Sequence, residues 1–469
     1  MSRAQISPIS VYKLLPRINC KECGEENCMA YATKLVNREA RIDMCSPLLK
    51  EENREAYQKL WHMLKPPIKE VKIGTGARSK KVGGKLVIYR HELTWTNPTA
   101  IAIDITDEMD DEKLRKRVKE VEDFSFSYIG TNLSLDMIAL RSTSNDPDKF
   151  YTAAKRLIDS PLPIVLCSLD PKTVERGLIV LGKSSPLIYA ATKDNWREMA
   201  DLALRYKCPL VVFAPNDLGL LRSLTRTLIE YGVSDLILDP GTFPEEGLAD
   251  TISNFIALRG AAIKGGDELL GFPLLGVPLT VWMEHEGAVE VAVWNETWLA
   301  AMLMNRYADM LIMHSLEGWA QLPLTILRNN LYTDPRKPIA VEPGLKTLGQ
   351  PSEASPLLLT SNFALTYYTV VSDIESGKVD CYLLVVDSEG LSVESAVAGR
   401  KLTSEKVAEA LTEYKVDETV KHRKLIIPGR AARLSGEIEE ATGWKVIVGP
   451  VDSSGIPKFI KEDWPKLAA

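Results

Sequence analysis

The chain has 469 residues with 57 basic and 63 acidic side chains, a formal net charge of −6, and this length predicts several domains. Its 45% hydrophobic and 26% charged residues exclude wholesale disorder, and its mild acidity gives no general reason to bind nucleic acid. The N-terminus has no apolar signal core and the uncharged run 269–283 is interrupted by Pro273 and Pro278, so we expect a cytoplasmic protein that crosses no membrane.

Four of the seven cysteines, Cys20, Cys23, Cys28 and Cys45, lie within 26 residues, where an even spread would place roughly 0.4. Thiolates at these spacings can converge on one centre, and both structural zinc and a [4Fe-4S] cluster fit. The single two-residue pair favours iron–sulfur, because zinc sites more often use two such pairs. A disulfide framework is disfavoured in a long chain without an export signal. The remaining cysteines predict core positions: Cys167, Cys208 and Cys381.

The first 65 residues are expected to form a small domain around the cysteine cluster. Asn27 can cap a helix over 28–42, and a second helix over 48–64 is expected to end at Pro66-Pro67. The basic stretch 68–92 predicts a hairpin around Gly83-Gly84, with a solvated surface favoured over an anion site. An iron–sulfur cluster on so small a segment points to electron delivery.

From about residue 95 to 335, short apolar strands alternate with amphipathic helices. Eight such units predict a closed (β/α)8 barrel of TIM type, with a doubly wound open sheet as the alternative. Either 127–130 or 137–140 could be the second strand. The expected strands are 101–105, 127–130, 164–167, 187–190, 210–213, 236–238, 279–282 and 310–313.

Residues 336–356 are rich in Pro, Gly and Ser and predict a linker. The expected segments are therefore 1–65, 66–335, 336–356 and 357–469. In the last segment, strands and helices alternate again, which predicts a Rossmann-like module. Its expected strands are 357–360, 381–387, 424–427 and 445–448, and its expected helices are 363–376, 404–414, 431–442 and the tail from 456.

Small and hydroxyl-bearing residues follow each strand of this module. The site residues expected in and beside these loops are Thr360, Thr366, Gly390, Leu391, Ser392, Val393, Gly429, Gly449, Ser453, Ser454 and Gly455. Ligands of open α/β sheets bind beyond the carboxyl ends of the strands, where small residues admit close approach and hydroxyls give neutral hydrogen bonds. In any single loop such residues are typical of turns. Four such loops predict a site for a large ligand that is polar at its edges and not strongly anionic.

Several blocks resemble the large subunit of the corrinoid iron–sulfur protein, which is also the gamma subunit of the archaeal acetyl-CoA decarbonylase/synthase complex. These blocks are the run 7–16, the cysteine spacing, and residues 360–366, 389–393, 422–429 and 448–456. The resemblance covers nearly the whole chain in the same domain order. It implies a [4Fe-4S] cluster on the four clustered cysteines, a (β/α)8 barrel, and a C-terminal cobamide-binding domain whose contacts match Thr360, Thr366 and the run from Gly390 to Val393.

The resemblance also implies a function in the Wood–Ljungdahl pathway. In this family, cob(I)amide accepts a methyl group from a methyl-tetrahydropterin through a pterin methyltransferase and passes it to acetyl-CoA synthase/CO dehydrogenase. The cluster, reduced by a low-potential donor such as ferredoxin, returns Co(II) to Co(I). A homologous small subunit docks on the barrel to form a heterodimer.

The C-terminal module has one histidine, His422, which lies before a strand, at the end far from the expected ligand. No Asp-x-His-x-x-Gly loop occurs in the sequence. We therefore expect a base-off cobamide whose cobalt has no protein ligand, because fewer axial ligands favour the nucleophilic Co(I).

Two other functions stay open. The carboxyl ends of the barrel strands carry Asn216, Asp217, Asp239, Glu284-His285-Glu286 and His314, from which a pterin methyltransferase or a metal hydrolase could be built. Each of these residues is also typical of a strand-end cap or a bonded polar group. Alternatively, the chain is an electron-transfer or assembly protein without a cobamide.

Overall fold

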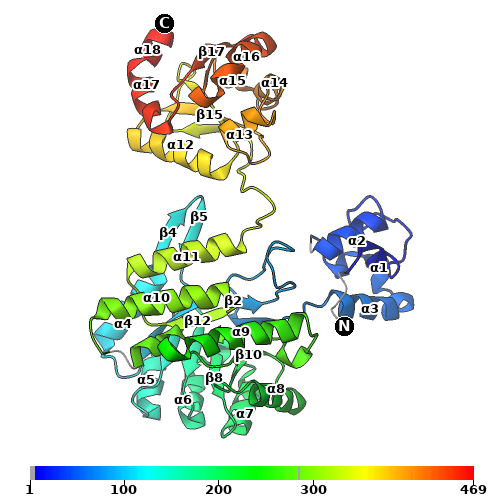
Figure 1. The fold of residues 1–469 in the computed structure, drawn as a ribbon, viewed down its shortest axis with the longest axis vertical. Coiled ribbons are helices and arrows are strands. Elements are labelled where there is room, and N and C mark those ends of the chain that lie inside the picture. Colours follow the sequence, from blue (N-terminus) through cyan, green and yellow to red (C-terminus); the bar gives the residue numbers. More distant parts are fainter. Residues whose placement is uncertain (1–5, 38, 284–285, 469) are drawn as a thin grey trace. The chain divides into compact units, whose positions relative to one another are not determined.

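The computed structural model describes residues 6–37, 39–283 and 286–468. The chain divides into two compact units, Met1–Phe126 with Leu133–Tyr332, and Ser127–Asn132 with Thr333–Ala469. Figure 1 traces the elements in both units. Among the described helices, none is long and apolar enough to cross a membrane.

The N-terminal residues form three helices, α1 (Pro8–Tyr12), α2 (Cys28–Asn37) and α3 (Arg54–Leu64), around a small core of their own. Helix α2 begins where predicted, because Asn27 Oδ1 accepts the Ala30 amide over 2.9 Å. It ends earlier than the predicted residue 42. Two 3-10 turns, Ser46–Leu49 and Glu51–Asn53, occupy the start of the predicted second helix.

The hairpin of β1 (Glu70–Thr75) and β2 (Arg78–Gly83) turns at residues 76–77, so the prediction of a turn at Gly83-Gly84 was wrong. Gly83 serves close packing instead, since a Cβ there would lie 2.3 Å from the Lys69 carbonyl oxygen. The basic residues of the stretch 68–92 are not all solvated. Lys85 is 1% exposed and pairs with Asp309 over 2.7 Å.

Eight parallel strands in the order β10-β9-β8-β7-β6-β3-β12-β11 form the barrel. The barrel is closed, because the Leu238 amide of β10 donates to the Pro273 carbonyl over 2.8 Å and Leu238 bridges Leu274, next to β11. The (β/α)8 prediction is confirmed, and the open sheet is excluded. The strands are β3 (Ala100–Thr106), β6 (Met137–Arg141), β7 (Ile164–Cys167), β8 (Leu187–Ala191), β9 (Leu210–Phe213), β10 (Leu236–Asp239), β11 (Leu275–Gly276) and β12 (Met310–Met313). The helices are α4 (Asp111–Asp123), α5 (Pro147–Lys155), α6 (Pro171–Leu181), α7 (Trp196–Tyr206), α8 (Leu218–Tyr231), α9 (Leu248–Ile263), α10 (Val289–Asn305) and α11 (Gly318–Tyr332).

Two predicted barrel strands were misplaced. The second strand is β6, whereas residues 127–130 lie in a separate hairpin of β4 (Ser125–Tyr128) and β5 (Thr131–Ser134). Residues 279–282 lie in a 3-10 turn, Pro278–Met283, after the short seventh strand β11. A short apolar run such as 279–282 is consistent with a buried strand, but the run alone does not exclude another buried conformation.

The C-terminal unit holds a sheet of order β13-β15-β14-β16-β17. Strands β14 (Leu357–Ser361), β15 (Cys381–Val386), β16 (Lys424–Ile427) and β17 (Lys445–Val448) are parallel, and β13 (Gly344–Leu348) is antiparallel at the edge. Separate apolar cores lie on the two faces of the sheet, which confirms the Rossmann-like prediction. One face carries α13 (Val393–Ala398), α14 (Ser404–Glu413), α15 (Val416–Thr419) and α16 (Ser435–Thr442); the other carries α12 (Ala364–Gly377), α17 (Ile456–Glu462) and α18 (Trp464–Ala468).

Much of the predicted linker 336–356 belongs to this module. Strand β13 pairs with β15 along its whole length. Upstream, the Val341 amide donates to the Asn362 carbonyl over 2.8 Å and the Ala364 amide donates to the Ile339 carbonyl over 2.9 Å. The residue composition of 336–356 is typical of a linker. The hydrogen bonds of an edge strand are formed by backbone groups, so this composition does not prevent them.

Candidate functional site

The site lies at the carboxyl ends of the parallel strands of the C-terminal module. Strands β14 and β16 are neighbours there, although β15 comes between them in sequence. Ligands of doubly wound sheets bind at such a switch point. A cavity of about 340 Å³ opens at this place, which is the size of a small ligand pocket. Its polar and small lining residues include Thr360, Thr366, Ser392, Arg430, Gly449, Asp452 and Ser453.

Two hydroxyl groups at the end of β14 are buried without protein partners. The side chains of Thr360 and Ser361 are 1% and 0% exposed, and neither hydroxyl has a hydrogen-bond partner among the residues that the structure describes. Thr360 lines the cavity. A buried hydroxyl without a partner is destabilising, so Thr360 marks a place where a ligand in the cavity can supply the missing bond. Ser361 is the next residue of the strand, faces the other side of the sheet and is not among the residues that line the cavity.

Asn362 ties the end of β14 to the loop after β15. Its Oδ1 accepts the amides of Ser388 and Gly390, each over 3.0 Å, and the Ser388 hydroxyl over 2.8 Å. Its Nδ2 donates to Asp387 Oδ1 over 3.0 Å. This buried amide fixes the loop that leads into Ser392 and Val393, and the sequence analysis had not singled it out as a site residue.

Six of the predicted site residues line the cavity together. They are Thr360, Thr366, Ser392, Val393, Gly449 and Ser453. The sequence analysis missed the pair Arg430–Glu394 at the same cavity, with 2.7 Å between Arg430 Nη1 and Glu394 Oε2. Both residues are charged in the sequence, but nothing there showed that the first turn of α13 and the 3-10 turn Gly429–Leu434 bring them together.

The other five predicted site residues are not among those that line the cavity. Leu391 packs against the apolar core, and Ser454 donates its hydroxyl to Asp452 Oδ1 over 2.6 Å. Gly390 has a φ of +73°, and a Cβ there would lie 2.7 Å from Pro338 Cβ. Gly429 and Gly455 also serve loop packing, since a Cβ would lie 2.9 Å from the Gly449 carbonyl oxygen or 3.0 Å from Pro450 Cβ, respectively. These glycines shape the loops rather than line the cavity.

His422 lies at the opposite end of β16, as predicted. The Lys424 amide donates to its Nδ1 over 3.0 Å, and its Nε2 is 2.9 Å from the Ser355 carbonyl oxygen. Both ring nitrogens are therefore occupied by backbone groups.

The four clustered cysteines lie in one part of the N-terminal helical segment. Cys20 is exposed, Cys23 is half-buried, and Cys28 and Cys45 are buried, and all four are free thiols. Burial raises the pKa of the Cys45 thiol, and the charges of Cys23, Cys20 and Cys28 raise it further. No group of three or more His, Cys, Asp or Glu among the described residues is arranged to hold a metal ion.

Cys28 is the first residue of α2, and its amide donates to Asn19 Oδ1 over 2.9 Å. The loop before it turns through left-handed residues, of which Gly24 has a φ of +83°. An anionic cluster bound by these thiolates would face the positive end of the α2 dipole. The other three cysteines, Cys167, Cys208 and Cys381, are buried core residues, as predicted.

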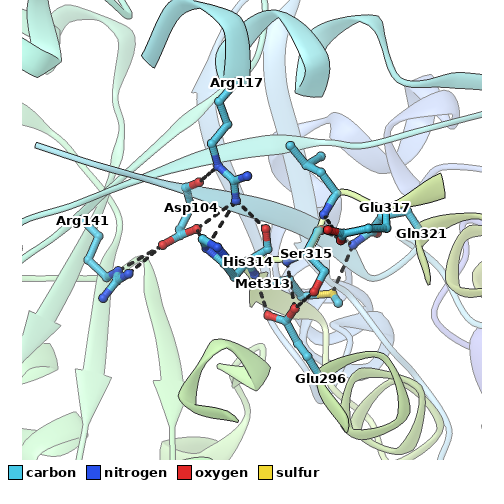
Figure 2. Close-up of polar contacts among 10 residues, drawn as sticks. Asp104, Arg117, Arg141, Glu296, Met313, His314, Ser315, Glu317 and Gln321 are labelled. Atoms are coloured by element: carbon cyan, nitrogen blue, oxygen red, sulfur yellow. Dashed lines mark hydrogen bonds and ion pairs between the residues drawn. The ribbon is translucent and has the colours of Figure 1, made fainter. Parts of the chain in front are cut away.

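At the carboxyl ends of the barrel strands, an ion-pair cluster surrounds Asp104 (Figure 2). His314 Nδ1 lies 2.6 Å from Asp104 Oδ1, and the guanidinium groups of Arg141 and Arg117 lie 2.9 and 3.3 Å from this carboxylate. Burial raises the pKa of Asp104, but these three neighbours outweigh burial and hold it below its usual range. Beside the cluster, Glu296 accepts the amide of His314 over 2.5 Å and that of Ser315 over 2.8 Å.

The other barrel candidates also carry structural bonds. Asp217 caps α8 by accepting the Leu220 amide over 2.8 Å, and Asn216 Oδ1 accepts Asn254 Nδ2 over 2.9 Å. Asp239 accepts the Tyr189 hydroxyl over 3.0 Å, and burial raises the pKa of Asp239 to about 7. Glu284 and His285 lie outside the described residues. Asn216, Asp217, Asp239 and His314 are thus explained by internal contacts, whereas Glu286 lines a separate cavity of the barrel.

Two family models match the chain. One described as "CO dehydrogenase/acetyl-CoA synthase delta subunit" matches residues 70–460. One described as "Putative Fe-S cluster" matches residues 15–47, which include all four clustered cysteines.

Relatives match over nearly the full length. Acetyl-CoA decarbonylase/synthase complex subunit gamma 2 of Methanosarcina thermophila is 46% identical over 98% of this chain and 99% of its own. The gamma subunit of Methanothermobacter thermautotrophicus is 45% identical over 97% of this chain and 98% of its own. A solved dihydropteroate synthase from Thermus thermophilus is 15% identical over 56% of this chain and 100% of its own, with a TM-score of 0.39, too low to carry an inference. The chain belongs to the family of acetyl-CoA decarbonylase/synthase complex gamma subunits, the large subunits of corrinoid iron–sulfur proteins.

Proposed function

We propose that the chain is the corrinoid methyl carrier of a CO dehydrogenase/acetyl-CoA synthase complex in the Wood–Ljungdahl pathway. A bound cobamide would supply a cobalt centre that takes a methyl group from a methyl-tetrahydropterin, by way of a pterin methyltransferase, and gives it up to acetyl-CoA synthase. A homologous small subunit would complete a heterodimer. The family match over nearly the whole chain supports the proposal.

The observation that carries the cobamide assignment is the Thr360 hydroxyl at the switch point, which is buried, has no hydrogen-bond partner among the described residues and belongs to a residue that lines the cavity. A cobamide has neutral amide groups at its edge, and hydroxyls can donate to or accept from amides without an added charge. The adjoining cavity of about 340 Å³ is apolar in its depth, with Leu358, Leu383 and Ile426 in its wall. These residues fit part of a large cofactor that is polar at its edge.

His422 supports a base-off cobamide with no protein ligand on cobalt. Its two ring nitrogens are held by backbone groups at the far end of β16. The ligand-side loops after the four parallel strands contain no histidine. The chain therefore offers the cobalt no imidazole from this side of the sheet.

We further propose that Cys20, Cys23, Cys28 and Cys45 hold a [4Fe-4S] cluster. The family match of residues 15–47 supports it, and the spacing of the cysteines in the sequence agrees with it. The cluster would take an electron from a low-potential donor such as ferredoxin and return oxidised cobalt to its active state. The N-terminal helices, through residue 65, would form the cluster domain.

The test is anaerobic purification of the full chain together with the small subunit, followed by iron and cobalt analysis and a visible spectrum. We expect about four iron atoms and about one cobalt per chain, a corrinoid band, and no histidine nitrogen on cobalt. Iron without cobalt in an assembled heterodimer would favour the electron-transfer protein. Methyl transfer from the methylated pterin without a separate methyltransferase would favour catalysis by the barrel.

A further inference from the structure

An ion pair crosses the carboxyl end of β14. Glu394 lies in the first turn of α13, which follows β15, and Arg430 lies in the 3-10 turn Gly429–Leu434, which follows β16. In the sheet, β14 separates β15 from β16, so the ends of these two strands are two strand spacings, roughly 10 Å, apart. The two side chains bridge this gap, because Arg430 Nη1 lies 2.7 Å from Glu394 Oε2.

The ion pair borders the cavity at the switch point. Glu394, Arg430 and Thr360 all belong to the cavity lining, and the Thr360 hydroxyl is the buried group without a partner among the described residues. A ligand that bonds to this hydroxyl therefore comes to lie beside the ion pair. Arg430 is the only Lys or Arg among the described residues that line the cavity, so no other cation of this lining can replace it opposite Glu394.

A second contact holds the same two elements together away from the cavity. Arg433, in the same 3-10 turn, donates from Nη2 to the carbonyl oxygen of Val397 in α13. Neither residue lines the cavity. By contrast, the side chains of Arg430 and Glu394 are 51% and 69% exposed, and an exposed ion pair is weak enough to break and re-form in water. The pair can thus open while the two elements stay attached to each other.

We propose that the Arg430–Glu394 pair is a strap over the switch point, which opens to admit the ligand of this site and closes to slow its release. The proposal rests on the proposed function, which supplies a cobamide as the ligand. Because both partners belong to this chain, the strap closes with or without the ligand. It therefore slows uptake and release alike and leaves the affinity nearly unchanged, whereas a residue that bonds to the ligand changes mainly the release rate.

The test uses the full-length chain purified with its small subunit, and measures uptake and release of cobalt-radiolabelled cobalamin. Arg430→Gln should speed both processes roughly two- to fivefold, the range expected for the loss of an exposed ion pair, and leave their ratio unchanged. Glu394→Gln should act in the same direction. The double variant should be no faster than Arg430→Gln alone, because both changes open the same pair.

Lys401→Gln is the matched control. It removes another exposed ion pair of the same module, in which Lys401 Nζ lies 2.7 Å from Glu389 Oε1, and neither partner lines the cavity. Uptake and release should stay at the wild-type rates, and urea unfolding checks that each variant is folded. Equal acceleration in the control would overturn the proposal, as would unchanged rates in folded Arg430→Gln. Faster release with unchanged uptake would also overturn it, because Arg430 would then act as a direct ligand contact.

A second measurement does not depend on cobamide. Thr360→Cys places a thiol in the cavity lining, and peptide mass spectrometry follows its alkylation in the full-length chain. Adding Arg430→Gln should speed alkylation at this position by the same two- to fivefold, whereas adding Lys401→Gln should not. An alkylation rate that Arg430→Gln leaves unchanged would overturn the strap. Failure of the wild type to retain any cobamide would instead contradict the proposed function, so the two failures are distinguishable.

Discussion

A buried hydroxyl group without a partner costs roughly 1–3 kcal/mol, so the end of β14 is destabilised in the free chain. Thr360 and Ser361 supply two such groups in adjacent positions. A ligand in the cavity that satisfies the Thr360 hydroxyl recovers the share of this free energy that belongs to Thr360, since Thr360 and not Ser361 lines the cavity. Such a residue lowers the unfolding free energy of the free chain but strengthens ligand binding. Its role can therefore be tested by measuring these two quantities separately.

Thr360→Val removes a hydroxyl without breaking a protein hydrogen bond among the described residues. We expect the unfolding free energy of the cobamide-free chain to stay level or rise, while cobamide retention falls roughly tenfold, the value of one lost buried hydrogen bond. Urea unfolding and the cobalt-to-protein ratio after gel filtration measure the two effects. Thr360→Ser should retain cobalt, and equal cobalt in the valine variant would contradict the contact.

Asp239 makes stability depend on pH. Burial raises its folded-state pKa from 3.8 to about 7, so between these values the folded chain holds a proton that the unfolded chain has lost. The stability it contributes is fully present below its unfolded pKa and is lost as pH rises through about 7. The groups that face its carboxylate are the Tyr189 hydroxyl and the Gly241 amide.

Asp239→Asn should remove this dependence. We expect the unfolding free energy of the variant to gain on the wild type by about 1.4 kcal/mol for each unit of pH between the two pKa values. Urea unfolding of both proteins at pH about 4, 5, 6 and 7 measures the difference. A constant difference across the series would show that Asp239 does not titrate in this range.

At the scale of elements, the ligand-side loops of the C-terminal module are held in place by glycines and one asparagine. Asn362 joins the end of β14 to the loop after β15. Gly390 occupies a left-handed position against Pro338. The cavity therefore depends on contacts between loops, so a change that never touches the ligand can alter binding.

Gly390→Ala is expected to destabilise the module by about 1–2 kcal/mol, because alanine is strained at positive φ and its Cβ would press on Pro338. It should also lower cobamide retention through displacement of the loop. Gly436→Ala is the matched control, since a Cβ at this residue of α16 has no heavy atom within 4 Å and should be neutral or stabilising. Equal stability of the two variants would contradict this account.

At the scale of the whole molecule, the proposed cluster and the proposed cobalt site lie in different parts of the chain, so they can be separated by mutation. Cys20 is exposed and remote in sequence from the cavity residues. Removing one thiolate should impair the cluster while leaving the C-terminal loops intact.

Cys20→Ala should bind cobamide normally and still carry methyl groups, but recovery of oxidised cobalt by a low-potential donor should slow at least tenfold, because the electron source is impaired. The measurement is the rate of the corrinoid absorbance change after reductant is added. Cys208→Ala, a change at a buried core cysteine of the barrel, is the control and should leave this rate unchanged. Equal rates in the two variants would contradict electron delivery by the cluster.

Periodicity alone placed most strands of both α/β regions, because buried parallel strands are short apolar runs separated by amphipathic helices. It failed at 127–130 and 279–282, where such runs lie in a hairpin and a 3-10 turn. It also failed at 344–348, where Gly-rich and Pro-rich flanks surround an edge strand. Strand β13 is decided by its pairing with β15, which is distant in the sequence, whereas the hairpin and the 3-10 turn are formed by neighbouring residues.

The cysteine cluster shows what the sequence by itself determined. Four thiols at that spacing indicate a metal centre, because ligand spacing in a local segment is a property of the chain. The tertiary structure decided which predicted ligand-side residues share a cavity, and it separated Thr360, Ser392 and Ser453 from Gly390 and Ser454. It also showed that the Thr360 hydroxyl is buried without a hydrogen-bond partner among the described residues. Burial, unsatisfied hydrogen bonds and shared surfaces arise only when distant segments pack together. They therefore cannot be predicted from the order of the residues alone.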